Sequence, residues 1–166
     1  MNGNPDTDAP VRRSLSVSQW RRMALEGDRL PVVITLEGES MRPLIRRGRD
    51  RVTILPLTRE IRIGDVVLFQ AAPDLYVVHR VFRIKDGLIR TLGDNCMRPD
   101  PWMKPENIWG LVVRLERFGR SWNLDTGAWR AWGRFWMAIH PARVLYKRGR
   151  KLLGRCRRSL FRDRAA

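Results

Sequence analysis

The stretch "GDVVLFQAAPDLYVVHRVFRIKDGLIRTLGD", residues 64–94, carries the strongest fold signal in the chain. It contains three short runs rich in Val, Ile, Leu and Phe, and the turn-forming pairs Pro73-Asp74 and Asp86-Gly87 separate them. Runs of this composition, bounded by such residues, are typical of β-strands joined by tight turns. The stretch therefore predicts three consecutive antiparallel strands.

The same pattern continues on both sides of this stretch. "PVVITLEG" (31–38) and "DRVTILPL" (50–57) precede it, and "IWGLVVRLERF" (108–118) follows it. Several short strands at such spacing favour an antiparallel β fold. We therefore expect a mainly β protein whose catalytic or binding domain spans residues 30–118.

The segment before this domain, residues 1–29, is predicted to be an extension with one short helix. "SVSQWRRMALEGDRL" (16–30) has apolar residues at helical spacing, Ser16 or Ser18 is suited to cap it, and Gly27 is suited to end it. The first residues, "MNGNPDTDAP", are polar and do not resemble a secretory signal. No apolar run approaches the roughly 20 residues of a spanning helix. These features predict a cytoplasmic protein.

The segment after the domain, residues 119–166, is predicted to be a Trp- and Arg-rich helical tail. Trp129, Trp132 and Trp136 are three or four residues apart, as on one helix face, and Pro141 is expected to break or bend the helix. From Trp129 to the end there are twelve basic residues and one acidic residue, in a chain of net charge +16. Three interpretations remain open: a solvated extension, a site for nucleic-acid phosphates, or a helix on an anionic membrane surface. Peripheral membrane contact is favoured and nucleic acid ranks last.

Polar residues of three chemical types stand among or beside the predicted strands. Ser40 lies in "LEGESMRPLIRRG" (36–48) after an apolar run, His79 lies inside "YVVHRVF", and Asp94 and Asp100 follow "LIRTL". A serine needs a base to become a nucleophile, a histidine can take its proton near neutral pH, and a carboxylate can orient the imidazole. Taken alone, each residue has an ordinary explanation in a turn or a core.

Four short boxes in this region resemble the signal peptidase I family and the related LexA-type self-cleaving repressors. They are Ser40-Met41-Arg42-Pro43, Gly64-Asp65-Val66-Val67-Leu68-Phe69, Gly93-Asp94-Asn95 followed by Asp100, and Ile108-Trp109-Gly110-Leu111-Val112. They occur in the family's order within residues 36–113, a stretch of about 78 residues. The resemblance implies a partly open barrel of coiled antiparallel sheets and a serine peptidase site.

The residue at position 79 distinguishes two branches of that family. Bacterial leader peptidases and the repressors use a lysine as general base, whereas the endoplasmic-reticulum and archaeal type has a histidine, commonly in His-Arg-Val. This chain reads His79-Arg80-Val81 and so resembles the histidine branch. The resemblance implies Ser40 as nucleophile, His79 as base, Asp100 as orienting acid and Asp94 as a supporting residue.

Two features depart from the family pattern. Signal peptidases usually carry a hydroxyl residue two places before the nucleophile, and here that residue is Gly38, as in the repressor-type proteases. The oxyanion would then depend on backbone N–H groups such as that of Ser40. Signal peptidases also have membrane-spanning anchors, and none is expected here.

The sequence therefore predicts a serine endopeptidase that cleaves a leader or precursor peptide through an acyl-enzyme. Two alternatives stay open: a peptidase-like module that binds without catalysis, and a self-cleaving regulator. No cofactor or metal is expected, since Cys96 and Cys156 lack a metal-type spacing. A disulfide between them is not expected either.

Overall fold

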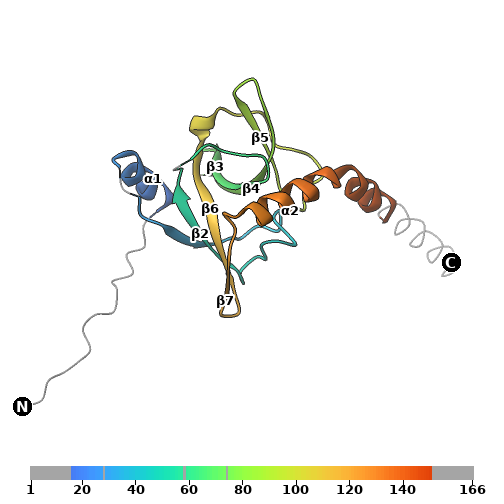
Figure 1. Ribbon diagram of the computed structural model, residues 1–166, viewed down its shortest axis with the longest axis horizontal. Coiled ribbons are helices and arrows are strands. Elements are labelled where there is room, and N and C mark those ends of the chain that lie inside the picture. Colours follow the sequence, from blue (N-terminus) through green and yellow to red (C-terminus); the bar gives the residue numbers. More distant parts are fainter. Residues whose placement is uncertain (1–15, 28, 58, 74, 151–166) are drawn as a thin grey trace, which may run out of the picture.

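The fold is mainly β, with seven antiparallel strands in one sheet that does not close. The computed structural model describes residues 16–150 except 28, 58 and 74 (Figure 1). Within these residues the helices are α1 (Val17–Leu25), the short 3₁₀ helix η1 (Pro105–Asn107) and α2 (Gly127–Ala138). The strands are β1 (Val32–Thr35), β2 (Arg51–Pro56), β3 (Val66–Ala72), β4 (Leu75–Lys85), β5 (Leu88–Leu92), β6 (Ile108–Arg117) and β7 (Arg120–Asn123). The structure confirms the prediction of a mainly β fold with antiparallel strands.

Strand β6 is the centre of the sheet, whose order is β1-β2-β6-β3-β4-β5. One edge of β6 pairs with β2, while its other edge pairs first with β3 and then with β7. Six strands lie where the apolar runs of the sequence predict them. Strand β7 is an addition, and it begins directly after the turn at Phe118 and Gly119, which both have positive φ angles.

Two apolar clusters cover the two faces of the sheet. The larger is built around Trp20 and β2, and the smaller around β3, β4 and β5. Helix α1 covers the larger cluster: Ser16 caps it in a capping box with Gln19, and Trp20 is 2% exposed. Gly27, with φ +104°, follows the helix as predicted.

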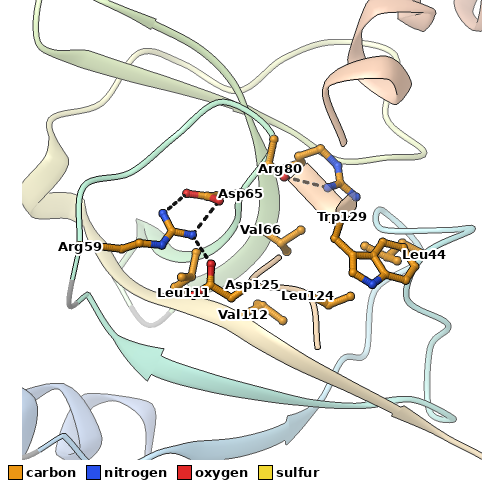
Figure 2. A pocket seen from close by; sticks show the side chains of 11 residues that line it. Leu44, Arg59, Asp65, Val66, Arg80, Leu111, Val112, Leu124, Asp125 and Trp129 are labelled. Atoms are coloured by element: carbon orange, nitrogen blue, oxygen red, sulfur yellow. Dashed lines mark hydrogen bonds and ion pairs between the residues drawn. The ribbon is translucent and has the colours of Figure 1, made fainter. Parts of the chain in front are cut away.

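Helix α2 is held against the sheet at the turn that begins β3. A methyl group on Gly64 would lie 2.8 Å from the carbonyl oxygen of Arg130, and one on Gly133 would lie 2.8 Å from the carbonyl oxygen of Gly64. Figure 2 shows Arg59 between Asp65 and Asp125, which it contacts at 2.8 and 2.7 Å. These glycines and ion pairs fix where the helix crosses the sheet.

Helix α2 ends at Ala138, and helical residues resume from His140 to Arg150 (Figure 1). The interruption is at Ile139, two residues before Pro141, where the sequence predicts a break or bend, because proline has no N–H to continue the hydrogen bonds of the helix. Within residues 16–150, no helix is both long enough and apolar enough to cross a membrane. Cys156 and the remaining basic residues of the tail lie outside the described residues.

Gly110 in β6 offers a test of this packing. We expect Gly110→Ala to lower the free energy of unfolding by about 1–3 kcal/mol, because overpacking a tight core strains it. The added methyl group would lie 2.7 Å from a side-chain carbon of Ile54 and 2.8 Å from the ring of Trp20. Urea denaturation measures the change.

The matched control is Gly127→Ala at the start of α2, where a methyl group meets nothing within 4 Å. It should leave stability unchanged or raise it by about 0.4–1 kcal/mol. Equal effects of the two substitutions would contradict the proposed packing.

Candidate active site

Ser40 begins a tight turn between β1 and β2, and its side chain is half-buried. The next residue, Met41, is 1% exposed and anchors the turn in the core, and its carbonyl accepts a hydrogen bond of 2.9 Å from the N–H of Ile45. The carbonyl oxygen of Ser40 accepts a hydrogen bond of 2.6 Å from the N–H of Asn95. The serine turn is therefore fastened both to the core and to the loop that carries Asp94.

His79 lies at the middle of β4, where both faces of the strand are covered. It is 7% exposed and pairs across the sheet with Val67, and its ring lies 6.0 Å from that of Phe69. Alternation along the strand places His79 on the side of the smaller cluster and Arg80 on the side of the larger one. His79 and Arg80 are adjacent in sequence but therefore lie in two different environments.

Asp100 contacts His79 directly. Its Oδ2 atom lies 2.7 Å from Nδ1 of His79 and also accepts a hydrogen bond of 2.6 Å from the hydroxyl of Thr91. The segment after β5 turns back along that strand, so the N–H of Asp100 donates to the carbonyl of Thr91 at 2.9 Å and Met103 bridges Ile89. This return places a carboxylate, six residues after Asp94, beside the imidazole.

Gly93 marks the point where the candidate groups meet. A methyl group built on it would lie 2.8 Å from the carbonyl oxygen of Ser40 and 2.9 Å from Nε2 of His79. The same methyl group would lie 2.7 Å from Sγ of Cys96. Only a glycine leaves this space open. The turn of Ser40 and the Nε2 atom of His79 therefore share one small volume. Within the described residues, the Ser40 hydroxyl makes no hydrogen bond to His79.

The electrostatics around His79 favour its protonated form. Burial alone would lower the pKa of His79, but hydrogen bonds to Asp100 and Cys96 and the charges of both groups outweigh it and raise the pKa to about 9. Because the folded value lies above the ordinary histidine pKa of 6.5, protonation of His79 stabilises the fold fully below pH 6.5. That contribution is lost as the pH rises through about 9.

Asp94 has a different partner from Asp100. Both of its carboxylate oxygens accept hydrogen bonds from Arg80, at 2.9 and 2.8 Å, and both side chains are 2% exposed. Arg80 also donates to the carbonyl of Gly64 at 2.9 Å, an interaction drawn in Figure 2. Asp94 therefore joins β4 to the loop after β5, while Asp100 is the carboxylate in contact with His79.

The helical segment from α2 onward holds the loop of residues 94–96. Trp136 and Arg143 donate to the carbonyl of Asp94 at 3.4 and 2.6 Å, and Lys147 donates to the carbonyl of Asn95 at 2.6 Å. His140 Nε2 lies 3.3 Å from the carbonyl of Cys96. The pKa of His140 is lowered by burial and by the nearby cations, so its neutral ring donates this bond at neutral pH.

The sequence brought together Ser40, His79 and Asp100 as candidates, and the structure places them around one junction. It did not single out Thr91, Arg80 or the residues that hold the 94–96 loop. The spacing of the residues that hold the loop was a usable signal. Positions 136, 140, 143 and 147 differ by four, three and four, which places them on one helix face. A buried threonine in β5 has no comparable signal, because its role depends on the returning segment.

Other sequence features have simple places in the structure. Met41 is a core anchor. Gly38 lies where an added methyl group would be 3.8 Å from Oγ of Ser40, so a side chain there would face the candidate nucleophile. In the part of the chain that the structure describes, no three His, Cys, Asp or Glu side chains lie close enough together to hold a metal ion. Comparison of the chain with protein-family models and with curated proteins gave no match.

The protonation state of His79 provides a direct test of this site. We expect its imidazole to titrate near pH 9 in the native protein, and Asp100→Asn to lower its pKa by about 1–3 pH units through loss of the opposing charge. Two-dimensional NMR of ring-labelled histidine measures both values. His140 is the only other histidine in the chain and is the internal control, since its pKa is lowered. A pKa unaffected by Asp100→Asn would contradict the assigned contact.

Proposed function

We propose that the protein is a serine endopeptidase with Ser40 as nucleophile, His79 as general base and Asp100 as the carboxylate that orients it. The observation that carries the proposal is the 2.7 Å contact between Asp100 and Nδ1 of His79. This contact leaves Nε2 as the nitrogen directed toward the turn of Ser40 at Gly93. The order of boxes that resembles the signal peptidase I family supports the same assignment.

The reaction follows from the positions of these groups. Nε2 of His79 removes the proton of the Ser40 hydroxyl, and Oγ attacks the carbonyl carbon of the scissile peptide bond. The tetrahedral oxyanion accepts hydrogen bonds from backbone N–H groups, with that of Ser40 the first candidate because position 38 is a glycine. His79 then protonates the leaving amine, and a water molecule activated by the same nitrogen releases the acyl group.

Only the neutral imidazole can act as the base. Since the pKa of His79 is raised to about 9, the active fraction grows with pH through that value. The rate constant kcat/KM should therefore rise about tenfold per pH unit below pH 8 and level off above pH 9. Substrate binding that displaces Cys96 from His79 would move the pH profile of kcat, which reports the pKa in the substrate complex, to lower pH, because the thiol is one of the groups that raise the pKa.

The substrate class is a leader or precursor peptide. Identification of the cleaved substrate in cells is the main test of the peptidase proposal. New protein N-termini are compared in cells that express the wild type, Ser40→Ala or Ser121→Ala. Ser121 is an exposed serine in β7 and serves as the matched control. We expect a set of termini that appears with the wild type and Ser121→Ala and falls at least about a hundredfold with Ser40→Ala.

Identical sets of termini in all three strains, with each protein folded and present, would contradict the peptidase proposal. Termini that map only to this chain itself would favour the self-cleaving regulator. The silent binding module has one observation in its favour, which is that the described residues show no hydrogen bond between Ser40 and His79. Catalytic hydrogen bonds often tighten only with substrate bound, so this observation does not outweigh the triad geometry.

We also propose that the helical segment contacts an anionic membrane surface. Large apolar side chains project into solvent along it: Trp132 is 42% exposed and Phe135 is 54% exposed, followed by Leu145 and Tyr146. Basic residues lie between them in the sequence. Aromatic and basic residues together on one helix match the composition of helices that lie in the membrane interface.

Sedimentation with vesicles tests this proposal. The double variant Trp132→Ala and Phe135→Ala should bind vesicles that contain phosphatidylserine about tenfold more weakly than the wild type, because less apolar area enters the interface. Phe118→Ala is the control, since Phe118 is 78% exposed at the β6–β7 turn. Equal binding by all three proteins, or no binding by the wild type at low salt, would contradict membrane contact.

A further inference from the structure

Cys96 lies at the same junction as the candidate triad, yet the peptidase mechanism does not use it. Its Sγ atom and Nε2 of His79 lie 2.7 and 2.9 Å from one point, the position of a methyl group on Gly93. The thiol is within hydrogen-bonding reach of His79, whose other nitrogen is bound to Asp100. Cys96, His79 and Asp100 therefore form a second nucleophile–base–carboxylate cluster that differs from the first only in its nucleophile.

The loop of Cys96 is fixed from both sides, so this juxtaposition is built into the fold. The N–H of Cys96 donates to the carbonyl of Gly93 at 2.9 Å, and its carbonyl lies 3.3 Å from His140 Nε2. The neighbouring Asn95 is bound to Ser40 on one side and to Lys147 on the other. The side chain of Cys96 is nevertheless partly exposed, so small reagents can reach it.

We propose that Cys96 is a second nucleophile of this site, a thiol that shares Nε2 of His79 with Ser40 and is modified by small soft electrophiles. In the reaction with iodoacetamide, the thiol loses its proton to water, the protonated imidazole of His79 stabilises the thiolate, and the sulfur attacks the methylene carbon. A C–S bond forms, the C–I bond breaks, and iodide leaves. The thiolate is the reactive form of cysteine, and an adjacent imidazolium held by a carboxylate promotes its formation.

Modification of Cys96 also has a consequence for Ser40, which rests on the proposed peptidase function. Nε2 is the one ring nitrogen not bound to Asp100, so the thiol and the hydroxyl compete for it. A group attached to Sγ would fill the space beside Gly93, where the carbonyl of Ser40 and Nε2 of His79 meet. Alkylation of Cys96 is therefore expected to switch off the serine.

The first experiment measures the rate of alkylation at Cys96 by peptide mass spectrometry, with iodoacetamide as the probe at pH 7. We expect native Cys96 to react about tenfold faster than the same cysteine in the guanidinium-denatured chain, since a free thiol is only a few per cent thiolate at this pH. His79→Gln and Asp100→Asn should each slow the native reaction toward the denatured rate. Cys156 is followed in the same digest as the internal standard.

Native Cys96 that reacts no faster than the denatured chain would overturn the proposal, as would equal rates in the wild type and in folded Asp100→Asn. The comparison of native with denatured wild type requires no variant to fold. None of these measurements depends on peptidase activity, so they test the thiol even if the serine proves inactive.

The second experiment follows labelling of Ser40 by a fluorophosphonate before and after iodoacetamide. We expect alkylation to lower this labelling at least about tenfold in the wild type, because the serine loses its base. The same treatment of Cys96→Ala should leave its labelling rate unaltered by iodoacetamide. Labelling that survives alkylation of wild-type Cys96 would overturn the competition for His79. An absence of labelling in all proteins would count against the proposed function alone.

Discussion

The buried ion pair between Arg80 and Asp94 is the interaction on which the rest of the site depends. It connects the middle of β4 with the loop after β5, and the same guanidinium reaches the carbonyl of Gly64 beneath α2. Removal of one partner from such a pair typically costs about 3–5 kcal/mol, because the other charge remains buried without compensation. The pair therefore holds three segments that are distant in sequence at one point, and the candidate triad lies on the opposite face of the same strand.

The alternation of a β-strand explains how one dipeptide supplies both a buried ion pair and the candidate base. His79 and Arg80 are neighbours in the chain, but they face different clusters and contact different aspartates. The same environment imposes a conflict: the proton that stabilises folded His79 must be absent for the imidazole to act as a base. The most stable protonation state of the resting protein is thus not the one that would start the reaction.

The sequence predicted the strands well because their apolar runs are short, rich in β-branched residues and separated by glycine and aspartate turns. It predicted Ser40, His79 and Asp100 through local boxes that resemble a known family, and the contact of His79 with Asp100 could not be derived from spacing. That contact depends on the segment that returns along β5 to bridge Ile89 with Met103. Strand β7 was missed because "RSWN" is short and mostly polar. The roles of Arg143 and Lys147 were hidden among many other basic residues of the tail.

The hydrogen bonds from the helical segment to the 94–96 loop have a consequence for local unfolding. Trp136, His140, Arg143 and Lys147 all bind backbone carbonyls of that loop, so detachment of the helix would expose these carbonyls to water together. Loop and helix should then open as one cooperative unit, with similar opening free energies along both. In this respect the helical segment of residues 127–150 is not an appendage of the β-sheet: its order and that of the site are set by the same equilibrium.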